Sequence, residues 1–180
     1  MKYQSSVIFY SLALALFVSI NSSAQIRRDV QKAKIMDSGV VAHVPCFNPT
    51  IDTTHNADGS IMYVVECQME PVLYNIIVIK SQTTAGGSVA EREYRLLSYT
   101  TQFKTMMDIE SCPVFKRDDK LLGNPDVIGL SYVCTGKDGV KFAIQGWQYD
   151  KEVVLYSISG PELPKTEAMN PLFNSVVFPR

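Results

Sequence analysis

Four cysteines and two histidines are the side chains of this 180-residue chain with the widest range of chemistry. A cysteine nucleophile needs a thiolate and a neighbouring base, and a structural zinc site needs ligands at short, repeated spacings. The chain contains no CxxC, and His43 and His55 are not paired at ligand spacing. The pattern therefore predicts neither a metal site nor a catalytic cysteine.

The even number of cysteines predicts two disulfides, because a chain that folds in an oxidising compartment pairs its cysteines. Four cysteines allow three connectivities, and hairpin registers favour one of them. A turn at Gly123-Asn124 would bring Cys112 within one residue of Cys134. A turn within residues 56–59 would bring Cys46 and Cys67 within about two positions of each other, close enough for a diagonal contact. We predict the pairs Cys46–Cys67 and Cys112–Cys134.

The remaining polar residues form no catalytic motif. Ser81, Ser98 and Ser157 lack a GxSxG context, and the chain has no HExxH, DxDxDG or glycine-rich phosphate loop. His43 alternates with valines, which is typical of a structural histidine in a strand, and His55 lies beside a polar turn. We expect no catalytic residues, no metal and no cofactor. A hydrolase assembled from residues distant in sequence is the remaining enzymatic alternative.

The N-terminus has the pattern of a secretory signal peptide. Lys2 precedes an uncharged apolar run over residues 7–20, and the small residues Ser22 and Ala24 fit the cleavage rule. The run is shorter than the roughly 20 residues that span a bilayer. We predict a signal peptide over residues 1–24, a secreted or periplasmic location, and no membrane span after cleavage. An uncleaved anchor is the alternative.

Charge and length exclude some classes of protein. Lys2 is the one charged residue of the predicted signal peptide, so the 17 basic residues fall to 16 against 18 acidic residues after cleavage. No basic block is present, so nucleic acid binding has no electrostatic support. The length fits one domain. We place this domain at residues 39–180, after a flexible lead-in over residues 25–38.

Residues 127–160 contain the clearest structural pattern, three strands that fold back on one another. Asp138-Gly139 is a dipeptide that two-residue hairpin turns prefer, because both central residues need positive φ. This turn sets Val133 against Ile144 and Leu130 against Trp147. It therefore fixes the expected register of the first hairpin.

A second tight turn at Asp150-Lys151 sets Trp147 against Val154 in the same group of strands. Side chains alternate across a strand, so two faces can be listed, and both are apolar. Two apolar faces predict a central sheet that is covered on both sides. One face would carry Ile128, Leu130, Tyr132, Cys134, Ala143, Trp147, Val154, Tyr156 and Ile158, and the other Val133, Phe142, Ile144, Val153 and Leu155.

The rest of the chain supplies further strands and two helices. Ser88 and Glu91 match a capping box, which predicts a helix over residues 88–107. Pro113 and the charges that follow it favour an edge strand over residues 108–122. The other expected elements are strands over residues 39–47, 60–70 and 73–81, and a closing helix over residues 166–178.

This order of elements resembles the PsbP-like fold, which PsbP proteins share with DcrB-like bacterial proteins. The residues that carry the resemblance are the helix over residues 88–107, the Leu121-Leu122-Gly123-Asn124-Pro125 turn, the strand over residues 153–159 before Gly160-Pro161, and the segment over residues 173–178. The resemblance implies an α+β fold, with an antiparallel sheet between helical layers (an α/β/α sandwich). It also implies a non-enzymatic binding or assembly factor.

Small residues mark a candidate binding surface on the sheet. The expected register sets Ser131 against Gly146 and Gly129 against Gln148, and small residues let a flat ligand or another backbone approach closely. A helix packed on that surface is the alternative. A second candidate is the ribbon over residues 115–120, whose free edge could take a partner strand.

Two functions follow from these patterns. The first is a secreted, non-catalytic accessory module that binds another protein. The alternative is a carrier of a small apolar ligand, which would lie in a gap beneath a helix.

Overall fold

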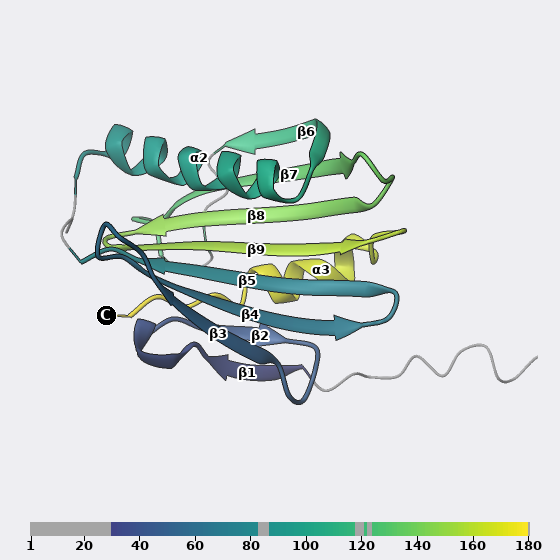
Figure 1. The fold of residues 1–180 in the computed structure, drawn as a ribbon, viewed down its shortest axis with the longest axis horizontal. Helices are drawn as coiled ribbons and strands as arrows, with labels where there is room; N and C mark the ends of the chain where they lie inside the picture. The colour runs from purple at the N-terminus through teal and green to yellow at the C-terminus, as the bar shows by residue number, and fades with distance from the viewer. Residues whose placement is uncertain (1–29, 83–86, 118–120, 122–123, 180) are drawn as a thin grey trace, which may run out of the picture.

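A computed structural model describes residues 30–82, 87–117, 121 and 124–179, which are mostly β-structure (Figure 1). Seven strands form one antiparallel sheet in the order β3-β4-β5-β9-β8-β7-β6, and β1 pairs with β2 in a second sheet. The strands are β1 Gln31–Lys34, β2 Val41–Val44, β3 Thr50–His55, β4 Ile61–Met69, β5 Val72–Lys80, β6 Ile109–Arg117, β7 Ile128–Gly136, β8 Lys141–Tyr149 and β9 Glu152–Gly160. The helices are a short 3-10 turn Met36–Ser38, α2 Val89–Met106 and α3 Thr166–Phe173.

The expected α/β/α sandwich is wrong, because helices do not cover both faces of the large sheet. Helix α2 lies on one face, over β6, β7 and β8 (Figure 1), and we call this the α2 face. On the opposite face, the two-stranded sheet and α3 take the place expected for a helical layer. The fold is therefore a large sheet with one long helix on one side and a mostly β cover on the other.

The cover begins in a segment that we expected to be a flexible lead-in. Residues 31–34 form β1, and Ile35, which follows directly, is fully buried. The hydroxyl of Ser38 donates to the carbonyl of Ile35 and closes the 3-10 turn. Lys32 and Lys34 alternate with Ala33 and Ile35, so the composition of this edge strand is similar to that of a solvated tail.

An expected pairing between residues 39–47 and 60–70 is also wrong. Val41–Val44 pairs with β1 instead, and β4 pairs with β3, the segment TIDTTH, to which we assigned no element. Ile51 is the one large apolar residue of β3, and most of the strand is exposed. An edge strand with water on both faces has no apolar alternation, so the usual strand pattern is missing.

The hairpin between β7 and β8 is shifted by one residue from the expected register. Val133 pairs with Ala143 and not with Ile144. The cause is a three-residue loop. The amide of Gly139 donates to the carbonyl of Gly136, and the amide of Gly136 donates to the carbonyl of Val140. Within this loop, Gly139 is the one residue with positive φ, at 82°, as in a type I turn that ends in a bulge. The second hairpin has the expected register, with Trp147 opposite Val154.

The one-residue shift moves every side chain of β7 to the other face of the sheet. Leu130 and Tyr132 therefore lie on the α2 face with Phe142 and Ile144, and not with Trp147 as expected. Each face has its own buried cluster. The α2 face holds Ile77, Ile79, Leu96, Phe103, Leu130, Tyr132, Cys134, Phe142, Ile144, Val153 and Leu155. The opposite face packs Trp147, Tyr156 and Ile158 against β1, β2 and α3.

Both expected disulfides are present, one on each face. Cys112–Cys134 joins the edge strand β6 to β7 within the α2-face cluster. Cys46–Cys67 ties the link between β2 and β3 to the inner strand β4 on the opposite face. The register of β6 against β7 shifts at the Cys112–Cys134 bond. The shift lies between Ser111, which pairs with Thr135, and Val114, which pairs with Val133. The turn at Gly123-Asn124, from which we predicted this pair, lies partly outside the described residues.

Candidate functional site

Among the described residues, the α2 face of the large sheet is only half covered. Helix α2 packs on the β6–β8 half, where Leu96 and Phe103 are buried against the sheet. No described helix lies over β4 and β5 on this face. A groove of about 1060 Å³ runs between α2 and these strands, and we call it the α2 groove. Its volume is at the upper end of the range for small-molecule sites.

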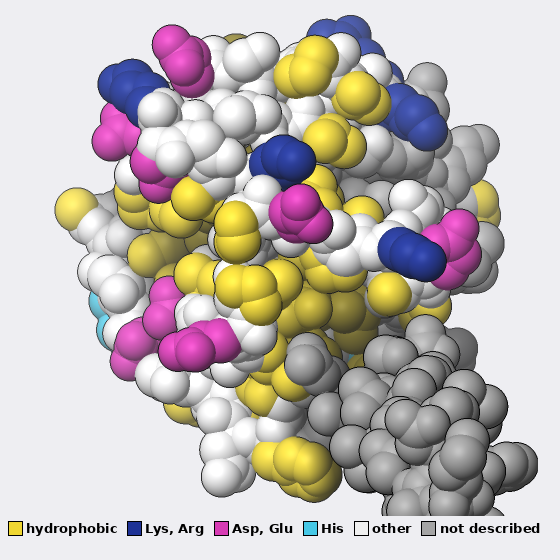
Figure 2. All heavy atoms as spheres, turned by 90° about the vertical axis from the view of Figure 1, so that its right-hand side faces the viewer, with side chains coloured by type: hydrophobic (Ala, Val, Ile, Leu, Met, Phe, Trp, Pro, Cys, Tyr) yellow, Lys and Arg dark blue, Asp and Glu magenta, His cyan; other side chains and the backbone are white. Residues whose placement is uncertain are grey.

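The floor of the α2 groove is apolar. Ile77 and Ile79 of β5 and Leu155 of β9 form its base, and Met62 of β4 forms its outer side. The first three are 7%, 5% and 2% exposed, whereas Met62 is half-buried. Phe103 of α2 closes the side next to the helix. Hydrophobic side chains also gather at the end of the molecule where α2 ends and β4 turns into β5 (Figure 2).

The helix lines the groove with a stripe of its own side chains. Glu91, Arg95, Tyr99, Gln102 and Met106 recur at spacings of three and four residues, so they lie along one face of α2. Tyr94 and Met106 are among the most exposed large apolar side chains of the described residues, at 76% and 68%. The groove wall is therefore part aromatic, part polar, and accessible to solvent.

The hairpin between β3 and β4 provides the polar rim. Asp58 Oδ1 accepts hydrogen bonds from the amide and the hydroxyl of Ser60, at 2.9 and 2.7 Å, and the hydroxyl is the first cause of the lowered pKa of Asp58. At the start of α2, Glu91 Oε2 accepts from the amide and hydroxyl of Ser88, which lowers the pKa of Glu91. Both carboxylates are thus ionised and held by their own turns.

Arg95 and Tyr99 lie between these two carboxylates. Burial is the main cause of the raised pKa of the Tyr99 hydroxyl, and the charge of Asp58 adds to it while Arg95 opposes it. Nη1 of Arg95 is shielded from solvent, and it makes no hydrogen bond within the described part of the chain. Arg95 also forms no ion pair with a described carboxylate. Arg95, a residue of the groove wall, thus has one donor without a partner among the described residues.

The four residues of the predicted binding surface do not come together. Gly129 and Ser131 pair with Trp147 and Gln145, whereas Gly146 and Gln148 pair with Leu130 and Ile128. The first two therefore lie on the opposite face from the second two. Gly146 lies beneath the helix, because an added Cβ would be 3.1 Å from Leu96. Gln148 is fully buried and donates to the carbonyl of Asp150.

The ribbon over residues 115–120 is described only to Arg117. Strand β6 is the last strand of the sheet, and its outer edge has no strand partner in the described residues. Val114 and Phe115 are 44% and 43% exposed, and Phe115 stacks on Tyr132 with the ring centroids 4.7 Å apart. This region presents apolar side chains beside a free edge.

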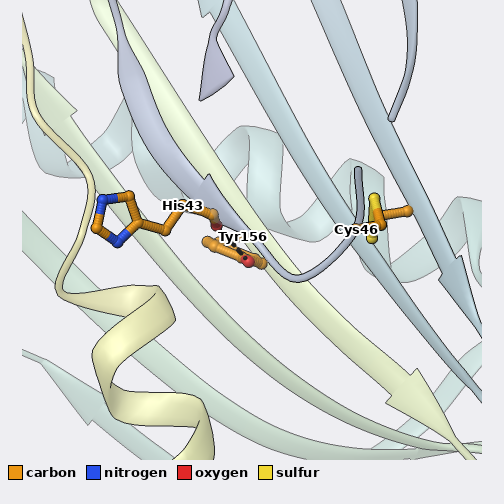
Figure 3. The surroundings of a disulfide bond; sticks show 4 residues. His43, Cys46 and Tyr156 are labelled. Atoms are coloured by element: carbon orange, nitrogen blue, oxygen red, sulfur yellow. Dashed lines mark hydrogen bonds between the residues drawn. A yellow bond between two sulfur atoms is a disulfide. The ribbon is translucent and has the colours of Figure 1, made fainter. Parts of the chain in front are cut away.

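His43 has a structural environment. Its amide donates to the Ser175 hydroxyl at 2.7 Å, and its carbonyl accepts from the Tyr156 hydroxyl at 2.9 Å. Figure 3 shows the imidazole pointing away from Cys46 and from Tyr156. His55 is exposed at the end of β3. Neither histidine lines the α2 groove.

Two further observations concern the described residues alone. Within them, no cluster of three or more His, Cys, Asp or Glu side chains is arranged to hold a metal ion. None of the described helices is long and apolar enough to cross a membrane.

The two disulfides fit a protein that folds in an oxidising compartment outside the cytosol. Compared with known proteins, the chain matches no protein-family model, no curated protein and no solved structure. Any function must therefore be argued from the site itself.

Proposed function

We propose that the chain is an exported, non-catalytic binding protein that carries a small apolar molecule in the α2 groove. The observation that supports this function best is the combination of an apolar floor and an open side. Ile79 and Leu155 at the floor are nearly excluded from water, yet about 1060 Å³ of space lies beside them. Concave sites with an apolar floor and a few polar groups are typical of small-molecule binding.

A dye-binding titration tests the proposal. Nile red, an uncharged apolar dye, should bind the wild-type protein and gain fluorescence. Met62→Asp places a charge on the outer side of the groove, and we expect it to weaken dye binding at least tenfold, because a bound apolar dye would remove water from a carboxylate that has no partner. Val133→Asp is the matched control, because Val133 is 39% exposed and lies on the opposite face.

Three outcomes would contradict the proposal: no dye binding by the wild type, unchanged binding by Met62→Asp, or equal losses in both variants. Near-ultraviolet circular dichroism of each variant must show that the fold is retained. Native mass spectrometry of the exported protein should in addition find a co-purified small molecule that Met62→Asp lacks.

A protein partner at β6 is the second candidate function. It is favoured by the free outer edge of β6 and by the exposed side chains of Val114 and Phe115. An extended segment of another protein could extend the sheet there by main-chain hydrogen bonds. Cross-linking from a photoreactive residue at position 114 in the exported fraction tests this idea. A single abundant cross-linked partner is expected, and a cross-link pattern equal to that from exposed position 36 would contradict it.

A further inference from the structure

Arg95 lines the α2 groove, and one of its donors has no partner among the described residues. Arg95 Nη1 is shielded from solvent without a hydrogen-bond partner. A buried donor without an acceptor loses its hydration and gains nothing in return, and the loss is larger for a charged group. Arg95 therefore lines the groove with part of its hydrogen-bonding capacity unused by the described residues.

We propose that the ligand of the α2 groove is an amphiphile with an acidic head group, such as a medium- or long-chain carboxylate, and that Arg95 binds the head group. This inference rests on the proposed function and specifies its ligand. The apolar tail would lie on Met62, Ile77 and Ile79, and the head would lie at the helix wall. A planar guanidinium pairs well with a carboxylate, since two parallel hydrogen bonds can form.

The carboxylates of Glu91 and Asp58 also line the groove, and their charges oppose an anionic ligand. Both are exposed to solvent, so water and salt weaken that repulsion. Each also accepts two hydrogen bonds within its own turn, from Ser88 and Ser60. Arg95 lines the groove itself, so a bound head group would lie at short range from its partly desolvated guanidinium, where the attraction is stronger.

Arg92 provides a matched control on the same helix. It is three residues before Arg95 and does not line the α2 groove. Its Nη1 donates to the Asp126 carbonyl at 3.0 Å, and its Nε, like Nη1 of Arg95, has no partner among the described residues, so the two arginines differ in their place relative to the groove. Replacing either arginine with glutamine removes one positive charge from α2, so the net charge of the two variants is equal.

Titration calorimetry with decanoate and with 1-decanol separates the head group from the tail. The wild-type protein should bind decanoate about tenfold or more tightly than decanol. Arg95→Gln should abolish this preference without changing the affinity for decanol, and Arg92→Gln should keep it. If Arg95→Gln proves unfolded, the wild-type protein still tests the inference, because raising NaCl from 50 to 500 mM should weaken decanoate binding and leave decanol binding unchanged.

Equal wild-type affinities for decanoate and decanol would overturn the acidic head group and leave the apolar carrier intact. A preference for decanoate that persists in Arg95→Gln would overturn the role of Arg95. If decanoate, decanol and Nile red all fail to bind, the proposed function fails with the inference.

Discussion

The two halves of the α2 face differ in what lies above them. Over β7 and β8, side chains such as Leu130 and Ile144 are buried beneath α2, at 2% and 0% exposure. Over β4, Met62 and Val64 face the same way but remain half-buried. The β4 and β5 half also carries polar side chains, because Glu66 and Asn75 lie on the same face as Val64 and Ile77. The position of helix α2 determines which half is covered.

A glycine at the centre of the sheet fixes that position. An added Cβ at Gly146 would lie 2.9 Å from Leu155, 3.1 Å from Leu96 and 3.3 Å from Leu130. Because glycine has no side chain, Leu96 of the helix reaches the sheet here and anchors α2 over β8. The groove over β5 is the space that this off-centre anchoring leaves.

Removing the anchor should have the largest effect on stability. Leu96 is fully buried at the contact between helix and sheet. Leu96→Ala should lower the free energy of unfolding by about 2 to 5 kcal/mol, because it leaves a cavity there. Urea denaturation followed by tryptophan fluorescence measures this change. A loss below about 1 kcal/mol would show that the helix is held in place by other contacts.

Removing each disulfide in turn compares how much the two faces of the sheet depend on their cross-links. Each closes a loop of similar size, with sequence separations of 21 and 22. Replacing Cys112 and Cys134 together with serine should therefore cost about 3 kcal/mol of stability, and the same change at Cys46 and Cys67 should cost a similar amount. Thermal unfolding of both double variants gives the comparison. A cost confined to one pair would show that local packing, and not loop closure, dominates.

Truncation on the open half should be mild. Met62→Ala removes a half-buried side chain from the groove, so it should cost about 1 kcal/mol or less. It should nevertheless weaken Nile red binding, because the side chain lines the groove. Urea denaturation and dye titration on the same samples separate the two effects. A cost as large as that of Leu96→Ala would mean that the groove is closed in solution.

The smallest expected effect depends on pH and concerns Glu152, which is 5% exposed and lies opposite Lys80 in the register of β5 and β9. Burial raises the pKa of Glu152 above its ordinary value of 4.5, and the charge of Asp150 adds to this while Lys80 opposes it. The folded state thus binds this proton more tightly than the unfolded chain does. Stability from this group falls as the pH rises from about 4.5 through the folded pKa.

Glu152→Gln removes this dependence. Its melting temperature should rise relative to wild type as the pH increases from 4 to 7. Asp37 provides a control of opposite sign, because the hydrogen bond from Tyr63 lowers its pKa. Stability from Asp37 is present above its ordinary pKa and is lost as the pH falls through the folded value. Equal melting differences for Glu152→Gln at every pH would contradict the expected titration.

Local chemistry predicts some elements of this fold well. Ser88 and Glu91 form the expected capping box, and α2 begins at Val89. The two-residue turn at Asp150-Lys151 gives the correct register for β8 and β9. In both cases the signal and the structure lie within a few residues of each other. The pairing of the cysteines was also predicted, although for Cys46 the expected strand partner was wrong.

Features that depend on long-range packing were missed. Asp138-Gly139 suits both a two-residue and a three-residue loop, and the one-residue difference reversed the faces of β7. The polar edge strand β3 gives no apolar alternation. No motif marks the α2 groove, because it results from where the helix rests. The recurrence of Glu91, Arg95, Tyr99 and Gln102 on one side of α2 was the available signal.

Strand β9 joins two groups of strands that are each local in sequence. One group is β3, β4 and β5, the other is β6 through β9, and the contact between them is the pairing of β5 with β9. Leu73 pairs there with Ser159, far along the chain, whereas hairpin partners are close neighbours. Closing such a long loop is slow compared with forming a hairpin. We therefore expect the two groups to form first and their docking along β5 and β9 to limit the rate of folding.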